Sequence, residues 1–349
     1  MDRALTPTGT PGPAGGVSRT FTGGGRPPAS PRPRDRALAW AAGPLLAVPA
    51  AVAGCRALGT DGVTPVPQLL SFLPWLTAPA GLGLLLAAAA RRRALAFAAA
   101  LVVTGTAWAS LPSAPPPAPG QAPPVARLRV IAANVEFGQA TGSLIDLARR
   151  ERPQVLFVSE CDPACARALT AALSAQLPHR VSVDAAGSAG SVLLSAHPLR
   201  DRSVVPSVMG MPGATADVAG RPVRLQLAHP MPPVPGQVAL WKAELARLRD
   251  AVADRPAGEA LVLAGDFNAS QDHAAYRGLL AAGPLHDAAR TTGASRTPTW
   301  PAEGPVPPYV QIDHVVTTPD LTATATRFPA LPGSDHRAVV ADLDLRDRR

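Results

Sequence analysis

The sequence predicts a layered α/β domain preceded by three transmembrane helices. Up to Pro124 the chain is rich in Ala, Leu, Pro and Gly and contains three long uncharged apolar runs. After Pro124, short apolar strands alternate with amphipathic helices, and polar residues follow the strands at their ends. Strand ends converge on one face in layered α/β folds, and binding sites form there. The length of 349 residues allows about two domains.

The charge of the chain is unevenly divided. Residues 1–124 contain 10 Arg and Lys against 3 Asp and Glu, whereas residues 125–349 contain 23 against 22. The net charge of +8 therefore belongs almost entirely to the N-terminal part. The nearly neutral C-terminal part lacks the basic excess typical of tight DNA or RNA binding, although a small phosphate substrate stays compatible with it.

The N-terminal part predicts a membrane anchor. Residues 1–36 have almost nothing to bury, which indicates a disordered tail. The apolar runs 37–55, 69–90 and 94–111 are each close to the roughly 20 residues that cross a bilayer. A buried soluble helical bundle is the alternative, and three runs without an internal charge disfavour it. Seven prolines within residues 112–124 indicate an extended, semi-rigid spacer.

Arginines set the predicted orientation. The tail and the cluster Arg91–Arg93 are positive and should be cytoplasmic. Three crossings then place residues 125–349 outside the cytoplasm, as part of a multi-pass protein of the cell membrane. The stretch Val52–Cys55 also resembles a bacterial lipoprotein cleavage box, but small residues are equally ordinary at helix contacts.

The C-terminal part, residues 125–349, alternates between strands and helices. Apolar runs predict strands at 127–135, 155–159, 190–195, 223–228, 261–264, 312–317 and 338–345. Amphipathic or capped stretches predict helices at 143–151, from about 163, at 236–254 and from about 272. Pro153 ends the first of these helices, and Pro163 suits a first-turn position in the second.

The most informative strand runs from Leu261 to Ala264 and continues into Gly265, Asp266, Phe267 and Asn268. Asp266 and Asn268 stand two residues apart, on the same side of an extended backbone. Asp266 is suited to take a proton from water while Asn268 holds the group that water attacks. The alternative is a strand that simply ends in an Asp/Asn turn.

The same pattern recurs at the other strand ends. The polar residues found there are Asn134, Glu136, Glu160, His229, Asp266, Asn268, Asp313, Asp335 and His336. A random scatter of Asp and His would not keep falling at strand ends, so we expect these side chains to share one site. His273, His286 and His314 have no required role in it and are interpreted as surface or supporting residues, and Asp272 as a helix N-cap.

Six short motifs in this order resemble the endonuclease/exonuclease/phosphatase superfamily, which has a deoxyribonuclease-I-like fold. They are Ala133-Asn134-Val135-Glu136, Val158-Ser159-Glu160, Ala228-His229-Pro230, Gly265-Asp266-Phe267-Asn268, Ile312-Asp313-His314 and Ser334-Asp335-His336. The three apolar runs and the spacer also resemble the bacterial, membrane-anchored branch. The resemblance implies a four-layer sandwich, in which two packed β-sheets are flanked by helices.

The resemblance also implies roles. Glu160 would be the principal ligand of Mg²⁺, or of Mn²⁺ or Ca²⁺, with Asn134 and Asp335 in or near the metal shell. Asp266 would orient or deprotonate water, Asn268 and His229 would hold phosphoryl oxygens, and His336 would face the phosphate, oriented by Asp313. These types agree with metal-assisted phosphoryl chemistry, because Mg²⁺ prefers oxygen ligands and the transition state needs its charge neutralised.

The leading hypothesis is therefore a membrane-anchored, extracytoplasmic, metal-dependent phosphoesterase. Its substrate would be a lipid headgroup, a nucleic acid or a small phosphate, its helices would contact the bilayer, and no obligate protein partner is indicated. The alternative is a non-catalytic binding module on the same fold. Cys161 and Cys165 are spaced for either a disulfide or free thiols, and a metal pair is disfavoured because no further Cys or His lies near.

Overall fold

The computed structural model describes residues 32–111 and 123–347. Most of the predicted tail, 1–36, and most of the predicted spacer, 112–124, lie outside the described residues. The last residues assigned to the tail are helical instead, since the first helix begins at Pro33. Proline is favourable at this position because its missing N–H has no partner in the first turn anyway.

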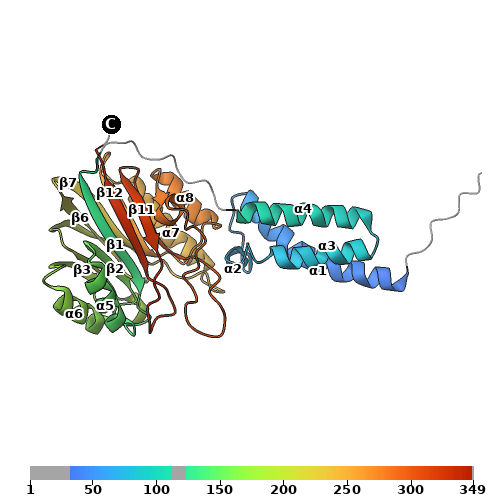
Figure 1. Cartoon of the computed structure of the whole chain (residues 1–349), viewed down its shortest axis with the longest axis horizontal. Helices are drawn as coiled ribbons and strands as arrows, with labels where there is room; N and C mark the ends of the chain where they lie inside the picture. The colour runs from blue at the N-terminus through green and yellow to red at the C-terminus, as the bar shows by residue number, and fades with distance from the viewer. Residues whose placement is uncertain (1–31, 112–122, 348–349) are drawn as a thin grey trace, which may run out of the picture.

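Four helices form an elongated bundle that projects from the rest of the protein (Figure 1). They are α1 (Pro33–Ala57), α2 (Val66–Leu70), α3 (Thr77–Ala89) and α4 (Arg93–Ser110). Among the described residues, α1 and α4 are the two helices that are long and apolar enough to cross a membrane by length and composition. Of the three predicted spans, the second, 69–90, is therefore not confirmed.

The second predicted span, 69–90, is divided in the structure. Helix α2 ends at Leu70, a series of turns follows, and α3 begins at Thr77. Pro74 lies within these turns and has no N–H with which to continue a helix from α2. Pro79 lies in the first turn of α3, where it is tolerated. This leaves α3 with 13 residues, fewer than the roughly 20 that cross a bilayer.

The remainder of the chain contains two six-stranded sheets. The first has the order β11-β12-β1-β2-β4-β3 and the second β5-β6-β7-β8-β10-β9. The strands of the first sheet are β1 (Ala126–Asn134), β2 (Val155–Ser159), β3 (His179–Val183), β4 (Ser191–Ser195), β11 (Leu321–Arg327) and β12 (Val339–Leu345). Those of the second are β5 (Leu199–Val205), β6 (Met211–Val218), β7 (Arg221–Ala228), β8 (Ala260–Asp266), β9 (His286–Asp287) and β10 (Asp313–Thr317).

The two sheets pack face to face and are covered by helices on their outer faces. One apolar cluster lies between the sheets and includes Phe157, Leu225 and Val262. A second joins the first sheet to α5 (Thr141–Glu151) and α6 (Pro163–Leu173). A third joins the second sheet to α7 (Val238–Ala253) and α8 (Ala274–Ala282), while the short α9 (Ala288–Thr291) follows β9. The expected packed sheets flanked by helices are confirmed.

The topology gathers strand ends at one edge of the sandwich. β1 and β2 pair in parallel, as do β7 and β8, so four carboxyl ends point the same way. β10 is antiparallel to β8, and its first residue, Asp313, pairs with Asp266, the last residue of β8. β12 is antiparallel to β1, so the segment that enters β12 also lies at this edge. Loops from six strands therefore meet there.

Strands β3, β5, β6, β9 and β11 were not predicted from the sequence. β5 is a largely exposed edge strand with charged residues, β6 contains Pro212 and Gly213, and β9 has two residues. Such strands lack the continuous apolar run that identifies a buried strand. Each pairs with a strand that is next to it along the chain, as in the antiparallel ladder between β11 and β12.

The helical bundle is docked onto the sandwich through the connector, which we define as residues 58–76. Asp61 accepts hydrogen bonds from the backbone N–H groups of Ala274 and Ala275 at 2.6 and 2.9 Å, and so caps α8. The ammonium group of Lys242 donates to the carbonyl of Gly62 at 2.6 Å. Two backbone donors of a helix end are thus satisfied by a residue more than 200 positions earlier.

Two sequence interpretations are corrected by this contact. Asp272 does not cap α8; its carboxylate pairs with Arg296 at 2.7 Å and with Arg56, at the end of α1, at 3.3 Å. His273 is not a surface residue but is fully buried, with its Nε2 2.8 Å from the carbonyl oxygen of Pro67. Both residues join the sandwich to the bundle. The hydrophobic periodicity of residues 125–349 does not reveal that the bundle is their partner.

Candidate active site

Asp266 lies at the centre of the polar cluster formed by the strand ends. Asp266 is almost completely buried, with 2% of its surface exposed. The carboxylate accepts from the backbone N–H of Asn268 at 2.8 Å and from the side-chain amide of Asn134 at 3.2 Å. Burial outweighs these hydrogen bonds and the nearby charge of His336, and raises the pKa of Asp266 to about 7.

Asn134 and Glu160 come from the parallel pair of the first sheet. The amide nitrogen of Asn134 donates to Glu160 at 3.1 Å as well as to Asp266. The second carboxylate oxygen of Glu160 accepts from the backbone N–H of Phe137 at 3.3 Å. Burial raises the pKa of Glu160 above its ordinary value, although the hydrogen bond from Asn134 opposes this. One amide group thus joins a carboxylate of each sheet.

His336 and Asp313 form a buried dyad. His336 Nδ1 lies 2.9 Å from Asp313 Oδ2. The other ring nitrogen, Nε2, faces Asp335 at 3.7 Å and Asp266 at 3.8 Å. Burial alone lowers the pKa of His336, but the charges of Asp313 and Asp266 and the hydrogen bond to Asp313 raise it to about 10. The imidazole is therefore a fixed positive charge among carboxylates.

His229 has the opposite protonation state. It is 1% exposed, and its Nε2 lies 3.8 Å from Glu160 and 4.0 Å from Asp266, beyond hydrogen-bond distance. Within the described part of the chain, neither ring nitrogen has a hydrogen-bond partner. Burial, with the positive charge of His336, lowers the pKa of His229 to about 3. A neutral buried histidine with unpartnered nitrogens is suited to meet a ligand.

Asp335, Glu136 and Asn268 complete the set of predicted residues. Asp335 accepts from the indole N–H of Trp300 at 2.8 Å, and its own backbone N–H donates to Glu136 at 2.8 Å. Asn268 donates one side-chain hydrogen to the carbonyl of Pro230 at 2.9 Å. All the residues proposed from the sequence are therefore brought to one edge of the sandwich.

The backbone around the site adopts uncommon conformations. Glu136, Phe137, Glu160 and Asn268 all have positive φ, between 42° and 56°. Left-handed backbone is costly for residues with a side chain and is often found at functional sites. Gly265 has φ of 144°, and a Cβ there would lie 2.2 Å from the carbonyl oxygen of Ala228. Only glycine allows β8 to approach β7 so closely before Asp266.

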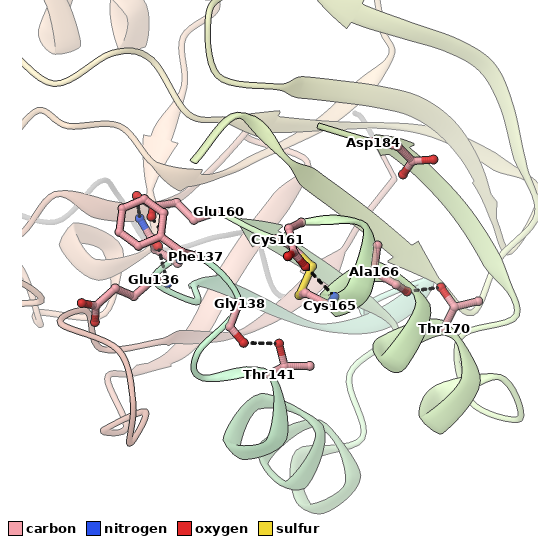
Figure 2. The surroundings of a disulfide bond; sticks show 12 residues. Glu136, Phe137, Gly138, Thr141, Glu160, Cys161, Cys165, Ala166, Thr170 and Asp184 are labelled. Atoms are coloured by element: carbon pink, nitrogen blue, oxygen red, sulfur yellow. Dashed lines mark hydrogen bonds between the residues drawn. A yellow bond between two sulfur atoms is a disulfide. The ribbon is translucent and has the colours of Figure 1, made fainter. Parts of the chain in front are cut away.

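A disulfide joins Cys161 to Cys165, directly after Glu160. Figure 2 shows the bond on the segment that follows Glu160, with Phe137 and Glu136 on the neighbouring segment. Asp162 caps α6 within the same turn by accepting from the backbone N–H of Cys165 at 2.8 Å. The open choice between bridged and free thiols is thus resolved in favour of the bridge, which closes the loop that positions Glu160.

The donor chemistry of the cluster suits a hard divalent cation. The carboxylates of Glu160 and Asp335 are the oxygen ligands that Mg²⁺ prefers. Asn134 directs its amide nitrogen at Glu160 while its oxygen accepts from the backbone N–H of Glu136 at 3.0 Å, so it would have to turn its oxygen toward Glu160 to join them. The raised pKa of Glu160 also marks a carboxylate whose charge lacks compensation. Side-chain atoms of Asp266, Asp313 and His336 lie within 4.8 Å of one another as well. That trio is already joined by the bond from His336 to Asp313, so it serves less well as a ligand set.

A cavity of about 540 Å³ opens over this cluster. Its wall includes both histidines, Asn268, Trp300, Tyr309 and four of the acidic residues, namely Glu136, Glu160, Asp266 and Asp335. Three residues of the connector also line it, namely Gln68, Ser71 and Phe72. The site is thus a concave pocket with a few convergent polar groups, as expected for a small-molecule or active site.

Comparison with known families decides the assignment. The profile described as "Endonuclease/Exonuclease/phosphatase family" matches residues 131–336. The chain belongs to this family. The matched region extends from β1 to His336 and contains all the residues of the polar cluster. A search of curated proteins finds no match for the sequence.

Solved structures share the fold of this endonuclease/exonuclease/phosphatase family member. D. rerio TDP2 complexed with single strand DNA product is 15% identical, with a TM-score of 0.52, covering 63% of this chain and 99% of that one. Proteins of the same family from Beutenbergia cavernae DSM 12333 and Bacteroides vulgatus are 24% and 17% identical, each with a TM-score of 0.52. They cover 63% of this chain and 72% and 100% of theirs. At these identities the similarity establishes the fold.

Sequence reasoning missed a second buried network behind the site. Asp287 lies 2.7 Å from His314 Nδ1 and accepts from the hydroxyl of Tyr276 at 2.7 Å. His314 Nε2 lies 3.0 Å from the carbonyl oxygen of Ala269. His314 stacks edge to face with Phe267, between Asp266 and Asn268. A signal was present in the motif Ile312-Asp313-His314, but the partner Asp287 lies in a two-residue strand without periodicity.

The His314–Asp287 pair predicts a pH-dependent contribution to stability. Asp287→Ala should lower the free energy of unfolding by about 3 kcal/mol, because it leaves a buried imidazolium unpaired. Burial alone would lower the pKa of His314, but the charge and hydrogen bond of Asp287 outweigh burial and raise the pKa of His314. Burial alone would raise the pKa of Asp287, but the charge and hydrogen bond of His314 outweigh burial and lower the pKa of Asp287. The loss should therefore be greatest between about pH 4 and pH 6.5 and shrink as pH rises through the pKa of folded His314.

Urea unfolding of both proteins across this pH range measures the difference. Asp250→Ala is the matched control, since the side chain of Asp250 is 60% exposed and pairs with its neighbour Arg249. A loss for Asp287→Ala equal to that of the control at every pH would contradict the buried ion pair.

Proposed function

We propose that this protein is a metal-dependent phosphoesterase, held in a membrane by its N-terminal helices, that hydrolyses a phosphodiester or phosphomonoester with an activated water. The observation that carries the proposal is the buried carboxylate of Asp266, which lines the cavity and is held by Asn268 and Asn134, and whose pKa burial raises to about 7. A group with a pKa near neutrality is suited to act as a general base. Membership of the endonuclease/exonuclease/phosphatase family supports the same reaction class.

Asp266 takes the proton of the attacking water in this proposal. The water oxygen forms a bond to phosphorus, the bond from phosphorus to the ester oxygen breaks, and the alkoxide or phenolate leaves and takes a proton from solvent. The backbone N–H of Asn268 and the amide of Asn134 hold the carboxylate in place at 2.8 and 3.2 Å. Asn268 donates one amide hydrogen to Pro230, so its proposed contact with a phosphoryl oxygen uses the second.

The two histidines would hold the phosphate by different means. His336, kept protonated by Asp313, contributes positive charge that compensates the phosphoryl oxygens. His229 is neutral and has unpartnered ring nitrogens, so it donates one hydrogen bond to an oxygen without adding charge. Glu160, Asp335 and Asn134 would hold the divalent cation. When bound, Mg²⁺, or Mn²⁺ or Ca²⁺, would neutralise charge on the phosphoryl group.

The exposed apolar surface of the bundle supports membrane insertion. Trp40 on α1 is 83% exposed and Phe97 on α4 is 69% exposed. Large apolar side chains exposed along helices of this length are expected where the helices contact a membrane or a partner. The start of α1 and the turn between α3 and α4 both lie at the end of the bundle that is far from the sandwich (Figure 1). Arg34, Arg36 and the cluster Arg91–Arg93 therefore share one end, as the positive-inside rule requires.

A topology experiment tests this orientation. A reporter fused after Leu111 should be active only outside the cytoplasm, and one fused after Arg93 only inside, because the arginine-rich end stays cytoplasmic. Alkaline phosphatase and green fluorescent protein fusions measure the two sides. The reverse pattern would overturn the orientation, and activity of both fusions on the inside would overturn the membrane anchor.

A non-catalytic binding module on the same fold is the second candidate, and turnover separates the two. The purified full chain in detergent should hydrolyse bis-p-nitrophenyl phosphate or p-nitrophenyl phosphate in the presence of Mg²⁺. EDTA should abolish the release of p-nitrophenol, and excess Mg²⁺ should restore it. Absence of turnover across such a panel with Mg²⁺, Mn²⁺ and Ca²⁺, in a folded protein, would favour the binding module.

Substitutions at Asp266 and at Glu160 should differ in whether added Mg²⁺ restores the rate. Asp266→Asn keeps the shape but cannot take a proton, so kcat should fall on the order of 100- to 10,000-fold and added Mg²⁺ should not restore it. Glu160→Ala should weaken metal binding, so that a higher Mg²⁺ concentration partly restores the rate. Asp250→Asn repeats the first substitution on the surface of α7 and should keep the wild-type rate. Retention of most activity by folded Asp266→Asn would refute the proposed base.

A further inference from the structure

One wall of the cavity does not belong to the sandwich. Gln68, in α2, and Ser71 and Phe72, in the turns that follow it, line the same cavity as Asp266 and His336. These residues belong to the connector between the first two apolar helices. The catalytic cluster therefore opens onto a surface that residues 125–349 alone do not provide.

The connector wall is fixed to the sandwich by specific contacts. The ring of Phe72 stacks on Tyr309, with centroids 4.2 Å apart and planes 17° from parallel. The indole N–H of Trp75 donates to the carbonyl of Tyr309 at 3.3 Å, and the side-chain amide of Gln68 donates to the carbonyl of Pro233. These contacts hold both sides of the cavity mouth in one arrangement.

The lining of the cavity divides into two chemical regions. The carboxylates and histidines gather at the sandwich edge, while the remaining wall is mainly apolar and includes Phe72, Phe137, Met209, Met231, Val234 and Tyr309. Phe137 is 55% exposed, so apolar side chains also reach the opening. Among the described residues that line the cavity there is no Lys or Arg.

We propose that the connector, and Phe72 above all, forms a subsite for an apolar group carried on the phosphoester, and thereby determines which substrates are hydrolysed. This inference rests on the proposed phosphoesterase function. The polar region has the groups to handle one phosphate, and the apolar wall begins beside it. A polynucleotide would bring further phosphates into the cavity, where His336 is already engaged with the first phosphate and no lining Lys or Arg compensates the others.

The position of the connector bears on the source of the substrate. The connector lies where the bundle meets the sandwich (Figure 1). If α1 and α4 cross a bilayer, this junction lies at its surface, and a lipid phosphoester presents its headgroup to the carboxylates and its apolar part to Phe72. A free phosphoester with an apolar ester group has the same chemistry and reaches the same subsite from solution.

Three diesters with the same leaving group separate these cases. Methyl p-nitrophenyl phosphate carries no large apolar group, phenyl p-nitrophenyl phosphate carries one in solution, and dodecyl p-nitrophenyl phosphate carries one that partitions into a bilayer. The full chain, reconstituted in phosphatidylcholine vesicles with Mg²⁺, should show the highest kcat/KM for a substrate with an apolar group. A preference for the phenyl ester indicates a soluble source, and a preference for the dodecyl ester alone a bilayer source.

Phe72→Ala tests the subsite directly. It should lower the kcat/KM ratio of the preferred apolar ester over the methyl ester about tenfold, mainly through KM, which corresponds to about 1.4 kcal/mol. Phe72→Leu, which keeps an apolar side chain, should recover much of the ratio. Val63→Ala is the matched control, because Val63 lies in the same connector, is 75% exposed and is not among the cavity residues. Its ratio should equal that of the wild type.

The outcomes distinguish this inference from the proposed function. Equal kcat/KM for the three esters, or an unchanged ratio in Phe72→Ala, would overturn the connector subsite while leaving the phosphoesterase intact. Loss of the ratio in both Phe72→Ala and Val63→Ala would show a general disturbance of the connector and would also overturn it. No hydrolysis of any ester by the wild type would overturn the proposed function, and the subsite with it.

Discussion

The burial of the Asp266 carboxylate is the constraint on which the arrangement of the site depends. A carboxylate removed from water is unfavourable unless polar partners surround it, and here each partner comes from a different part of the fold. Asn134 reaches it from the first sheet, Asn268 from the turn after β8, and His336 from the loop before β12. The parallel pairs β1–β2 and β7–β8 bring these segments to one edge, and Gly265 permits the close approach.

The same surroundings give two histidines different charges. Both are buried, and burial lowers the pKa of each. His336 faces Asp313, Asp266 and Asp335, whose charges reverse that effect, whereas His229 has no carboxylate within hydrogen-bond distance. Placement at a strand end therefore does not fix what a histidine does. The neighbouring residues from the two sheets decide whether the imidazole is positively charged or is a neutral hydrogen-bond donor.

The site residues could be predicted from the sequence because they stand at the ends of apolar strands, and the topology of the fold brings those strand ends together. Asp266, Glu160 and His229 each follow an apolar strand, so their convergence was predictable from topology alone. Asp272 was misread, and the surface alternative for His273 was wrong, because their partners Arg56 and Pro67 lie in the N-terminal part of the chain. A contact between two halves of different composition leaves no periodic signal in either half. The short and edge strands escaped for a similar reason, since pairing rather than an apolar run defines them.

Because Asp61 caps α8, the two halves of the protein are held together by non-covalent contacts as well as by the chain between α4 and β1. Asp61 satisfies two backbone N–H groups of α8, His273 is buried against Pro67, and Arg296 donates to the carbonyl of Ala109 at 2.9 Å, near the end of α4. Cleavage of the chain between α4 and β1 would leave all of these contacts in place. A protease acting at that point would therefore nick the protein without releasing its C-terminal half, because release would require the two halves to dissociate and expose a helix end and a buried imidazole.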